Sequence, residues 1–159
     1  MTTSETAESV LVPVDFSAHS EAALLFAVEC AEKMGASINV LHVIHDLGEA
    51  PGYYSVKGRK KQLRRMEDVA SEMLDHFIQE VQEKHPGLAA LNNLETILVK
   101  GLPVNRILEI AKKLNSRMIV MGSQGRTGLS HIMLGSKAEQ VVRLSPIPVT
   151  IVKQHKKPE

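Results

Sequence analysis

Met118-Ile119-Val120-Met121-Gly122-Ser123-Gln124-Gly125, followed after nine further residues by Gly135-Ser136-Lys137-Ala138, is the stretch of sequence that decides the fold. The apolar run 118–121 is typical of a buried strand, and 136–143 is typical of the start of a helix. Glycine lets a backbone approach an anion closely and adopt positive φ, and the first N–H groups of a helix carry partial positive charge. A strand, a glycine-rich loop and a helix N-terminus in this order therefore predict a phosphate-binding site.

Outward from this stretch, apolar segments that predict strands alternate with amphipathic segments that predict helices. Proline fits poorly inside a sheet, so Pro13 is expected at the C-terminal end of the first strand, and Gly35 is expected to end the first helix. The alternation predicts an α/β fold, a single doubly wound (Rossmann-like) domain whose five-stranded parallel sheet carries helices on both faces. The predicted strands are 9–14, 37–44, 94–99, 118–121 and 149–152, and the predicted helices begin near residues 17, 59, 103 and 136.

The chain is expected to divide into a flexible N-terminus (1–8), a domain (9–152) that contains the predicted phosphate-binding site, and a charged tail (153–159), with a polar loop at 45–58. The net charge of +1 and an aromatic content of 3% without tryptophan argue against a nucleic-acid partner. No apolar stretch approaches the roughly 20 residues that a membrane-spanning helix needs, so we expect no membrane partner and a cytoplasmic protein. Cys30 is the single cysteine and cannot form an intrachain disulfide.

Two loops at the same edge of the predicted sheet carry the candidate ligand-binding residues. Doubly wound sheets bind ligands beyond the C-terminal ends of their strands, where the strand order switches. If the first and fourth strands are neighbours, Asp15 and Gly122 face one crevice. The Asp15 carboxylate can accept hydrogen bonds from a ribose hydroxyl or an adenine amine, although a helix N-cap is the alternative. Val43, near the end of the second strand, offers backbone groups and an apolar wall to a base.

Polar residues beside the glycines are the candidates for the phosphate end. Ser136 is predicted to cap the last helix, with a hydroxyl that serves the backbone, a phosphate or both, and Ser123 is a second hydroxyl. Lys137 in the first helical turn opposes the helix dipole by about 0.3–1 kcal/mol, and a bound phosphate would reverse that sign. Arg126 lies inside the loop. For both cations the alternative is a side chain that points into solvent.

The sequence lacks the motifs of several catalytic families. It contains no Gly-x-Ser-x-Gly elbow, no Walker-type loop, and no Gly-x-Gly-x-x-Gly after the first strand. His42 and His45 have no nearby third ligand, so no metal site is predicted. The basic cluster at 57–65 is interpreted as a solvated helix face.

The spacing Gly-x2-Gly-x9-Gly-Ser, formed by Gly122, Gly125, Gly135 and Ser136, resembles the ATP-binding branch of the universal stress protein family. The segments 12–17, 41–43 and 146–152 are similar to the first, second and last strands of that family, and the resemblance extends from residue 10 to residue 152. One departure is Lys137, where the family often has a small or apolar residue after the serine. It leaves the preferred number of phosphates open.

The resemblance implies a five-stranded parallel sheet that binds an adenine nucleotide, ATP or AMP, with Mg²⁺ accompanying ATP. It implies an adenosine end at Pro13, Asp15 and Val43. It further implies that Met121, Gly122 and Gly125 line the ribose and phosphate path, and that Gly135, Ser136 and the backbone of Lys137 and Ala138 hold phosphates. It also implies a homodimer through the last strand, which consists of Val149, Thr150, Ile151 and Val152.

These expectations lead to a regulatory stress-response protein that acts as a nucleotide-dependent homodimer or as an interaction module for a regulated protein. The alternative is a slow ATPase or nucleotidyl-transfer enzyme. Transfer chemistry needs organised electrostatics and in-line positioning of a nucleophile, and Asp15 is the one obvious carboxylate at the predicted site. Binding is therefore favoured over catalysis, and no catalytic residue is predicted. A module with a vestigial loop is a third hypothesis, against which the intact glycine pattern argues.

Overall fold

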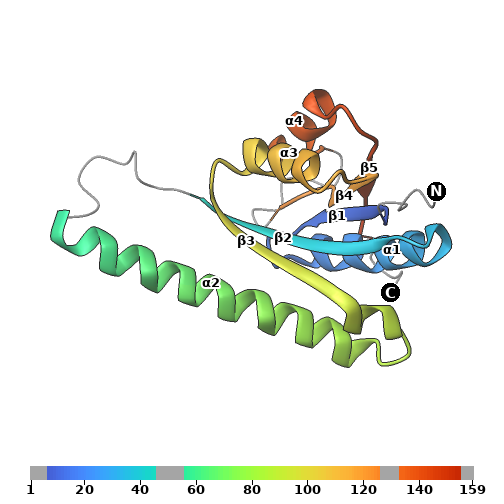
Figure 1. Cartoon of the computed structure of the whole chain (residues 1–159), viewed down its shortest axis with the longest axis horizontal. Coiled ribbons are helices and arrows are strands. Elements are labelled where there is room, and N and C mark those ends of the chain that lie inside the picture. The colour runs from blue at the N-terminus through green and yellow to red at the C-terminus, as the bar shows by residue number, and fades with distance from the viewer. Residues whose placement is uncertain (1–6, 46–55, 126–132, 155–159) are drawn as a thin grey trace, which may run out of the picture.

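The computed structural model describes residues 7–45, 56–125 and 133–154 and contains one five-stranded sheet. Its strands pair in the order β3-β2-β1-β4-β5, and every pair is parallel. The predicted α/β fold is confirmed, and β1 and β4 are neighbours (Figure 1). The strands are β1 (Ser9–Pro13), β2 (Ser37–His45), β3 (Leu94–Gly101), β4 (Met118–Gly122) and β5 (Val149–Val152).

Helices cover both faces of the sheet (Figure 1). The helices α1 (Ala18–Met34) and α2 (Val56–Lys84) pack on one face, and α3 (Pro103–Lys113) and α4 (Ser136–Leu144) pack on the other. A short 3₁₀ helix, η1 (Ala89–Asn93), precedes β3 and was not expected from the sequence. Among the described residues, no helix is both long and apolar enough to pass through a membrane.

The central strand β1 shows why its sequence reads as a continuous apolar run. All five of its residues are buried, because helices lie on both faces of the sheet. Val10 and Val12 pack toward α1 and α2, while Leu11 packs toward α3 and α4. Successive side chains of a strand point to opposite faces, so this single strand contributes to both halves of the core.

The ends of α1 follow local rules that the sequence makes visible. The hydroxyl oxygen of Ser17 accepts a hydrogen bond from the backbone N–H of Ser20 at 3.2 Å and caps the N-terminus. Gly35 has φ of 64° and closes the C-terminus in the left-handed conformation that glycine adopts without a steric penalty. Both predicted ends of this helix are therefore confirmed.

The largest difference from the predicted elements concerns α2. This helix begins at Val56 rather than near residue 59, so it includes Gly58. A glycine inside a helix costs about 1 kcal/mol relative to alanine, which is why the sequence favoured a loop there. His45 belongs to β2, and the rest of the predicted loop, 46–55, lies outside the described residues. The N-terminal part of α2 extends past the sheet (Figure 1).

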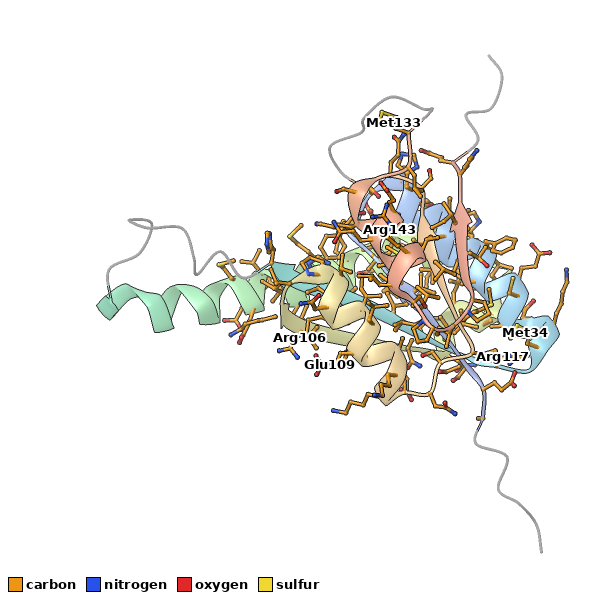
Figure 2. All side chains as sticks on the ribbon, turned by 90° about the horizontal axis from the view of Figure 1, so that it is seen from above. Met34, Arg106, Glu109, Arg117, Met133 and Arg143 are labelled. Atoms are coloured by element: carbon orange, nitrogen blue, oxygen red, sulfur yellow. The ribbon has the colours of Figure 1, made fainter. Side chains whose placement is uncertain are left out.

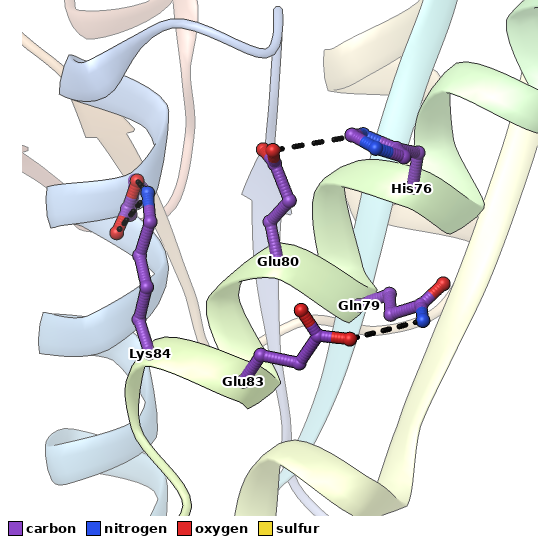
Figure 3. Close-up of polar contacts among 6 residues, drawn as sticks. His76, Gln79, Glu80, Glu83 and Lys84 are labelled. Atoms are coloured by element: carbon purple, nitrogen blue, oxygen red, sulfur yellow. Dashed lines mark hydrogen bonds and ion pairs between the residues drawn. The ribbon is translucent and has the colours of Figure 1, made fainter.

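Hydrogen bonds and ion pairs lie along the C-terminal part of α2, and one ion pair joins this helix to α1 (Figure 3). Along the helix, the side-chain amide of Gln79 donates to Glu83 at 3.1 Å. Across helices, the Lys84 ammonium lies 3.1 Å from a carboxylate oxygen of Glu21. Exposed ion pairs contribute at most about 1 kcal/mol, so the burial of Phe77 and Val81 contributes more to holding α2 on the sheet.

Candidate nucleotide-binding site

The C-terminal ends of β1 and β4 bring the two predicted loops together. The strands pair through Val10 with Met118 and through Leu11 with Ile119. Beyond the paired residues, the Asp15 Oδ2 atom lies 3.0 Å from the position that a Cβ atom on residue 125 would occupy. The carboxylate therefore faces the backbone of Gly125 directly, with no room for a side chain between them.

The Asp15 carboxylate is oriented by the first turn of α1. Its Oδ1 atom accepts hydrogen bonds from the Ser17 backbone N–H at 3.1 Å and from the Ser20 hydroxyl at 2.7 Å. The Asp15 N–H in turn donates to the Ser20 oxygen at 2.9 Å. The helix N-cap is Ser17, so the alternative role of Asp15 as the cap is not the one the structure shows. The two serines were not singled out as site residues, although the spacing Asp-x-Ser-x-x-Ser signals such a turn.

Apolar residues at the same edge form a wall on the α3 and α4 side of the sheet. Met121 is buried and Val43 is half-buried, and both pack in the cluster formed with those two helices. Pro13 is buried at the end of β1, on the face that Leu11 also occupies by strand alternation. These three predicted residues thus lie beside the Asp15 turn, on one face of the sheet.

The three motif glycines are needed for space rather than for positive φ. A Cβ atom on Gly122 would lie 2.7 Å from His19 Cβ, and one on Gly135 would lie 3.3 Å from the Ser123 carbonyl oxygen. Among the described residues, the glycines with positive φ are Gly35 and Gly101. The expectation of positive φ in the motif is therefore wrong for these glycines, and close approach alone explains them. The contact of Gly122 with His19 is a tertiary contact that no local sequence signal indicated.

Backbone hydrogen bonds tie the two described ends of the glycine loop to each other and to β5. The Gly135 N–H donates to the Ser123 carbonyl at 2.8 Å, and the Ser123 N–H donates to the Val152 carbonyl at 3.0 Å. The Gln124 side-chain amide also donates to the carbonyl of Met133 at 3.2 Å, a residue labelled in Figure 2. The ends of the loop are thereby fixed, while Arg126 lies outside the described residues.

The N-terminus of α4 follows directly on Gly135, which is the N-cap residue. The prediction that Ser136 caps this helix is wrong, because the extended conformation ends one residue earlier and Ser136 is the first helical residue. No described side chain caps this end. Ser136 and Lys137 are exposed, and Ala138 is buried. The first N–H groups of a helix have no intrahelical acceptor and carry partial positive charge, so this end suits an anion.

The two histidines and the basic cluster that the sequence analysis considered are not part of this candidate site. The Nδ1 atom of His42 lies 2.8 Å from the Val14 carbonyl oxygen, and His45 is exposed at the end of β2. Within 7–45, 56–125 and 133–154, no group of three or more His, Cys, Asp or Glu side chains is placed to hold a metal ion. The side chains of the basic cluster at 57–65 lie outside the description.

A parallel sheet in this order, with a glycine loop and an acidic turn at adjoining strand ends, defines a class of α/β nucleotide-binding folds. The family model of the universal stress proteins matches residues 6–153 of this chain. The chain belongs to the universal stress protein family. One relative, the universal stress protein MJ0531 of Methanocaldococcus jannaschii, is 32% identical over 94% of this chain and 84% of its own length.

Solved structures agree with this assignment. The universal stress protein UspA from Lactobacillus plantarum superposes with a TM-score of 0.74 at 27% identity, covering 91% of this chain and 97% of its own. A universal stress protein from Archaeoglobus fulgidus, solved in complex with dAMP, has the same fold, with a TM-score of 0.60 at 23% identity. That likeness covers 92% of this chain and 98% of the other.

Proposed function

We propose that this chain binds an adenine nucleotide, ATP or AMP, at the adjoining ends of β1 and β4. In this proposal it acts as a cytoplasmic stress-response regulator, either as a nucleotide-dependent homodimer or as an interaction module for a regulated protein. The observation that carries the proposal is that the Asp15 turn, the glycine loop and the start of α4 adjoin one another. Asp15 faces Gly125, Gly135 packs against the backbone of Ser123 and Gln124, and the uncapped end of α4 follows at once.

Asp15 and the apolar wall suit the nucleoside. A carboxylate is a strong acceptor for the hydroxyl groups of a ribose or the amine of adenine. Because Ser17 and Ser20 already fix one oxygen of Asp15, the carboxylate need not be ordered when the ligand arrives. Pro13, Val43 and Met121 supply the apolar surface that covers one side of a base.

The glycine loop and the start of α4 suit the phosphates. Helix N-termini preceded by glycine-rich loops bind anions through backbone N–H groups, and Gly122, Gly125, Gly135 and Ser136 supply such a loop. Ser123, Arg126, Lys137 and Ala138 complete the proposed set. Mg²⁺ is usually held by phosphate oxygens and waters with one or two carboxylates, so a metal that arrives with ATP does not require a protein cage. The dAMP complex of the Archaeoglobus relative is further support.

The homodimer is proposed to form through β5, which lies at one edge of the sheet. Its four residues, Val149 to Val152, carry no charge and are all half-buried. An apolar edge strand is a liability for aggregation unless it is covered. Pairing with a second copy would cover it, together with the exposed side chains of Val142 and Leu144 on α4.

The proposal is tested by denaturing the purified protein and identifying any released nucleotide by mass spectrometry. Thermal shifts with ATP, AMP and GTP complement this, because a ligand at 100 times its dissociation constant adds about 2.7 kcal/mol of stability. Gly125→Val should abolish binding, since its Cβ would meet the Asp15 carboxylate, and should leave the circular dichroism spectrum intact. Gly87→Val is the matched control, because nothing lies within 4 Å of its Cβ position. Absence of both released nucleotide and any adenine-specific shift would refute the proposal.

The alternative activity is slow ATP hydrolysis or nucleotidyl transfer at the same site. Turnover of the wild type above that of the Gly125→Val variant would establish it. Equal background rates in the two proteins, together with tight ATP binding by the wild type, would leave binding as the function.

A further inference from the structure

Phe16 has an uncommon backbone conformation at the centre of the candidate site. Its φ is 67°, and among the described residues the one other non-glycine residue with positive φ is Asn115. A bulky residue in the left-handed region is strained and persists only where its surroundings impose that conformation. Phe16 stands between Asp15 and Ser17, in the turn that presents the proposed nucleoside-binding carboxylate.

Two aromatic side chains from different elements hold the ring of Phe16. The ring centroid lies 4.3 Å from that of His42 on β2, with 32° between the planes. On the other element, the ring of Phe77 on α2 lies 5.8 Å away at 59°. Contacts between aromatic rings stabilise a fold beyond the burial of their area, so these two contacts oppose the strain of the backbone at Phe16.

His42 is itself fixed to the same turn. Its Nδ1 atom lies 2.8 Å from the Val14 carbonyl oxygen. A carbonyl only accepts, so Nδ1 carries the hydrogen and donates it. The ring that stacks on Phe16 is therefore anchored to the residue that precedes Asp15. Phe77 is buried in the core between α2 and the sheet. Both rings against which Phe16 packs are thus held by contacts of their own.

We infer that Phe16 is a positioning residue for the nucleoside end, one whose stacked ring imposes the left-handed turn that aims the Asp15 carboxylate at Gly125. The hydrogen bonds from Ser17 and Ser20 fix the carboxylate relative to α1. The φ of Phe16 sets how α1 leaves the end of β1, so it fixes the carboxylate relative to the glycine loop. This role rests on the proposed function and adds a residue that would not itself touch the ligand.

The test compares Phe16→Ala and Phe16→Gly with the wild type in the full-length chain. ATP affinity is measured by calorimetry, and exchange of the Ser17 amide hydrogen is measured by NMR on nucleotide-free protein. If alanine leaves the turn correctly formed in about a tenth of the molecules, the dissociation constant rises about tenfold. Glycine lacks the ring but tolerates positive φ, so its loss of affinity should be smaller. Ser17 exchange should accelerate in both variants, because its acceptor is Asp15.

Asn115→Gly is the matched control, because it relieves positive φ at a residue remote from the β1 turn, before the N-terminal end of β4. It should change neither affinity nor Ser17 exchange. If Phe16→Ala does not fold, Phe16→Leu retains a large apolar side chain and takes its place. Unchanged affinity and exchange alongside a lower melting temperature would overturn the inference and leave Phe16 as a packing residue. A wild type that binds no adenine nucleotide would refute the proposed function, while Ser17 exchange would still decide the positioning role.

Discussion

The candidate site has two halves that are built by opposite means. The nucleoside half is the turn from Asp15 to Ser20, where side chains make the hydrogen bonds that hold the carboxylate. The phosphate half comprises 122–125 and 135–138, where neighbouring atoms crowd the position that a Cβ would take at each glycine. Substitutions that shorten a side chain are therefore expected to damage the nucleoside half. Substitutions that add atoms to a glycine are expected to damage the phosphate half.

This difference separates what each half can discriminate. Directional side-chain acceptors select the chemical groups of a base or a ribose. Backbone N–H groups at a helix start recognise negative charge without reading the rest of the ligand. Comparing ATP with adenosine therefore assigns each variant to a half, because adenosine engages the nucleoside half alone.

The largest effect is expected for Gly122→Ala, which damages the frame that both halves share. The new Cβ would lie 2.8 Å from the carbonyl carbon of His19, so the backbone of α1 must move. Overpacking of this kind costs about 1–3 kcal/mol, to be measured by urea unfolding, and binding of ATP and adenosine should weaken together. Gly87→Ala serves as the control, since its Cβ position is open. Stability equal to that of the control would show that α1 adjusts freely.

Asp15→Asn should remove the charged acceptor while keeping the shape of the turn. Hydrogen bonds to charged groups contribute about 1.5–3 kcal/mol, which corresponds to roughly 10- to 150-fold in the dissociation constant. Calorimetry should show the same factor for ATP and for adenosine. Asp75→Asn, on the exposed surface of α2, is the matched control. If the affinity fell for ATP but not for adenosine, Asp15 would belong to the phosphate half, and the proposed division of the site would be wrong.

Ser20→Ala should have a smaller effect on the same half. Ser20 is buried, and its hydroxyl both donates to Asp15 Oδ1 and accepts from the Asp15 N–H. Its loss should cost about 1 kcal/mol of stability and weaken ATP and adenosine alike by a few-fold. Chemical unfolding and calorimetry measure the two effects, with Ser71→Ala on α2 as an exposed control. Unaltered affinity would mean that the carboxylate is oriented without the Ser20 hydroxyl.

The smallest effect is expected for Lys137→Gln in the phosphate half. Removing a cation from the first turn of α4 should stabilise the free protein by about 0.3–1 kcal/mol. In the bound protein the same cation favours phosphate, so ATP should bind about two- to fivefold more weakly and adenosine should bind unchanged. Arg143→Gln, in the last turn of α4 and paired with Glu139, is the control. Equal changes for ATP and adenosine would contradict the division.

The sequence predicted most of the nucleoside frame because local rules decide it. The apolar run of β1, the Ser17 cap and the Gly35 terminator each depend on residues close in the chain. The positive φ of Phe16 was not predicted, because the two rings that its side chain contacts, those of His42 and Phe77, are distant in sequence.

The glycine loop lies between a strand and a helix as predicted, but the expected reason for its glycines was wrong in part. Glycine is compatible both with positive φ and with close approach, and only three-dimensional neighbours decide between them. His19 and Ser123 decided in favour of close approach. Similarly, either residue of a Gly-Ser pair can be the N-cap of a helix, and the N-cap of α4 is Gly135, one residue before the predicted Ser136.

The hydrogen bond from the Ser123 N–H to the Val152 carbonyl joins the first turn of the glycine loop to the last residue of β5. This backbone hydrogen bond therefore connects the glycine loop with the strand at one edge of the sheet. If the chain forms a dimer, thermodynamic linkage makes the two effects equal. The factor by which dimer formation changes the affinity for nucleotide is the same factor by which nucleotide changes the affinity of one copy for another. Titrating ligand at several protein concentrations would measure that one coupling constant from either direction.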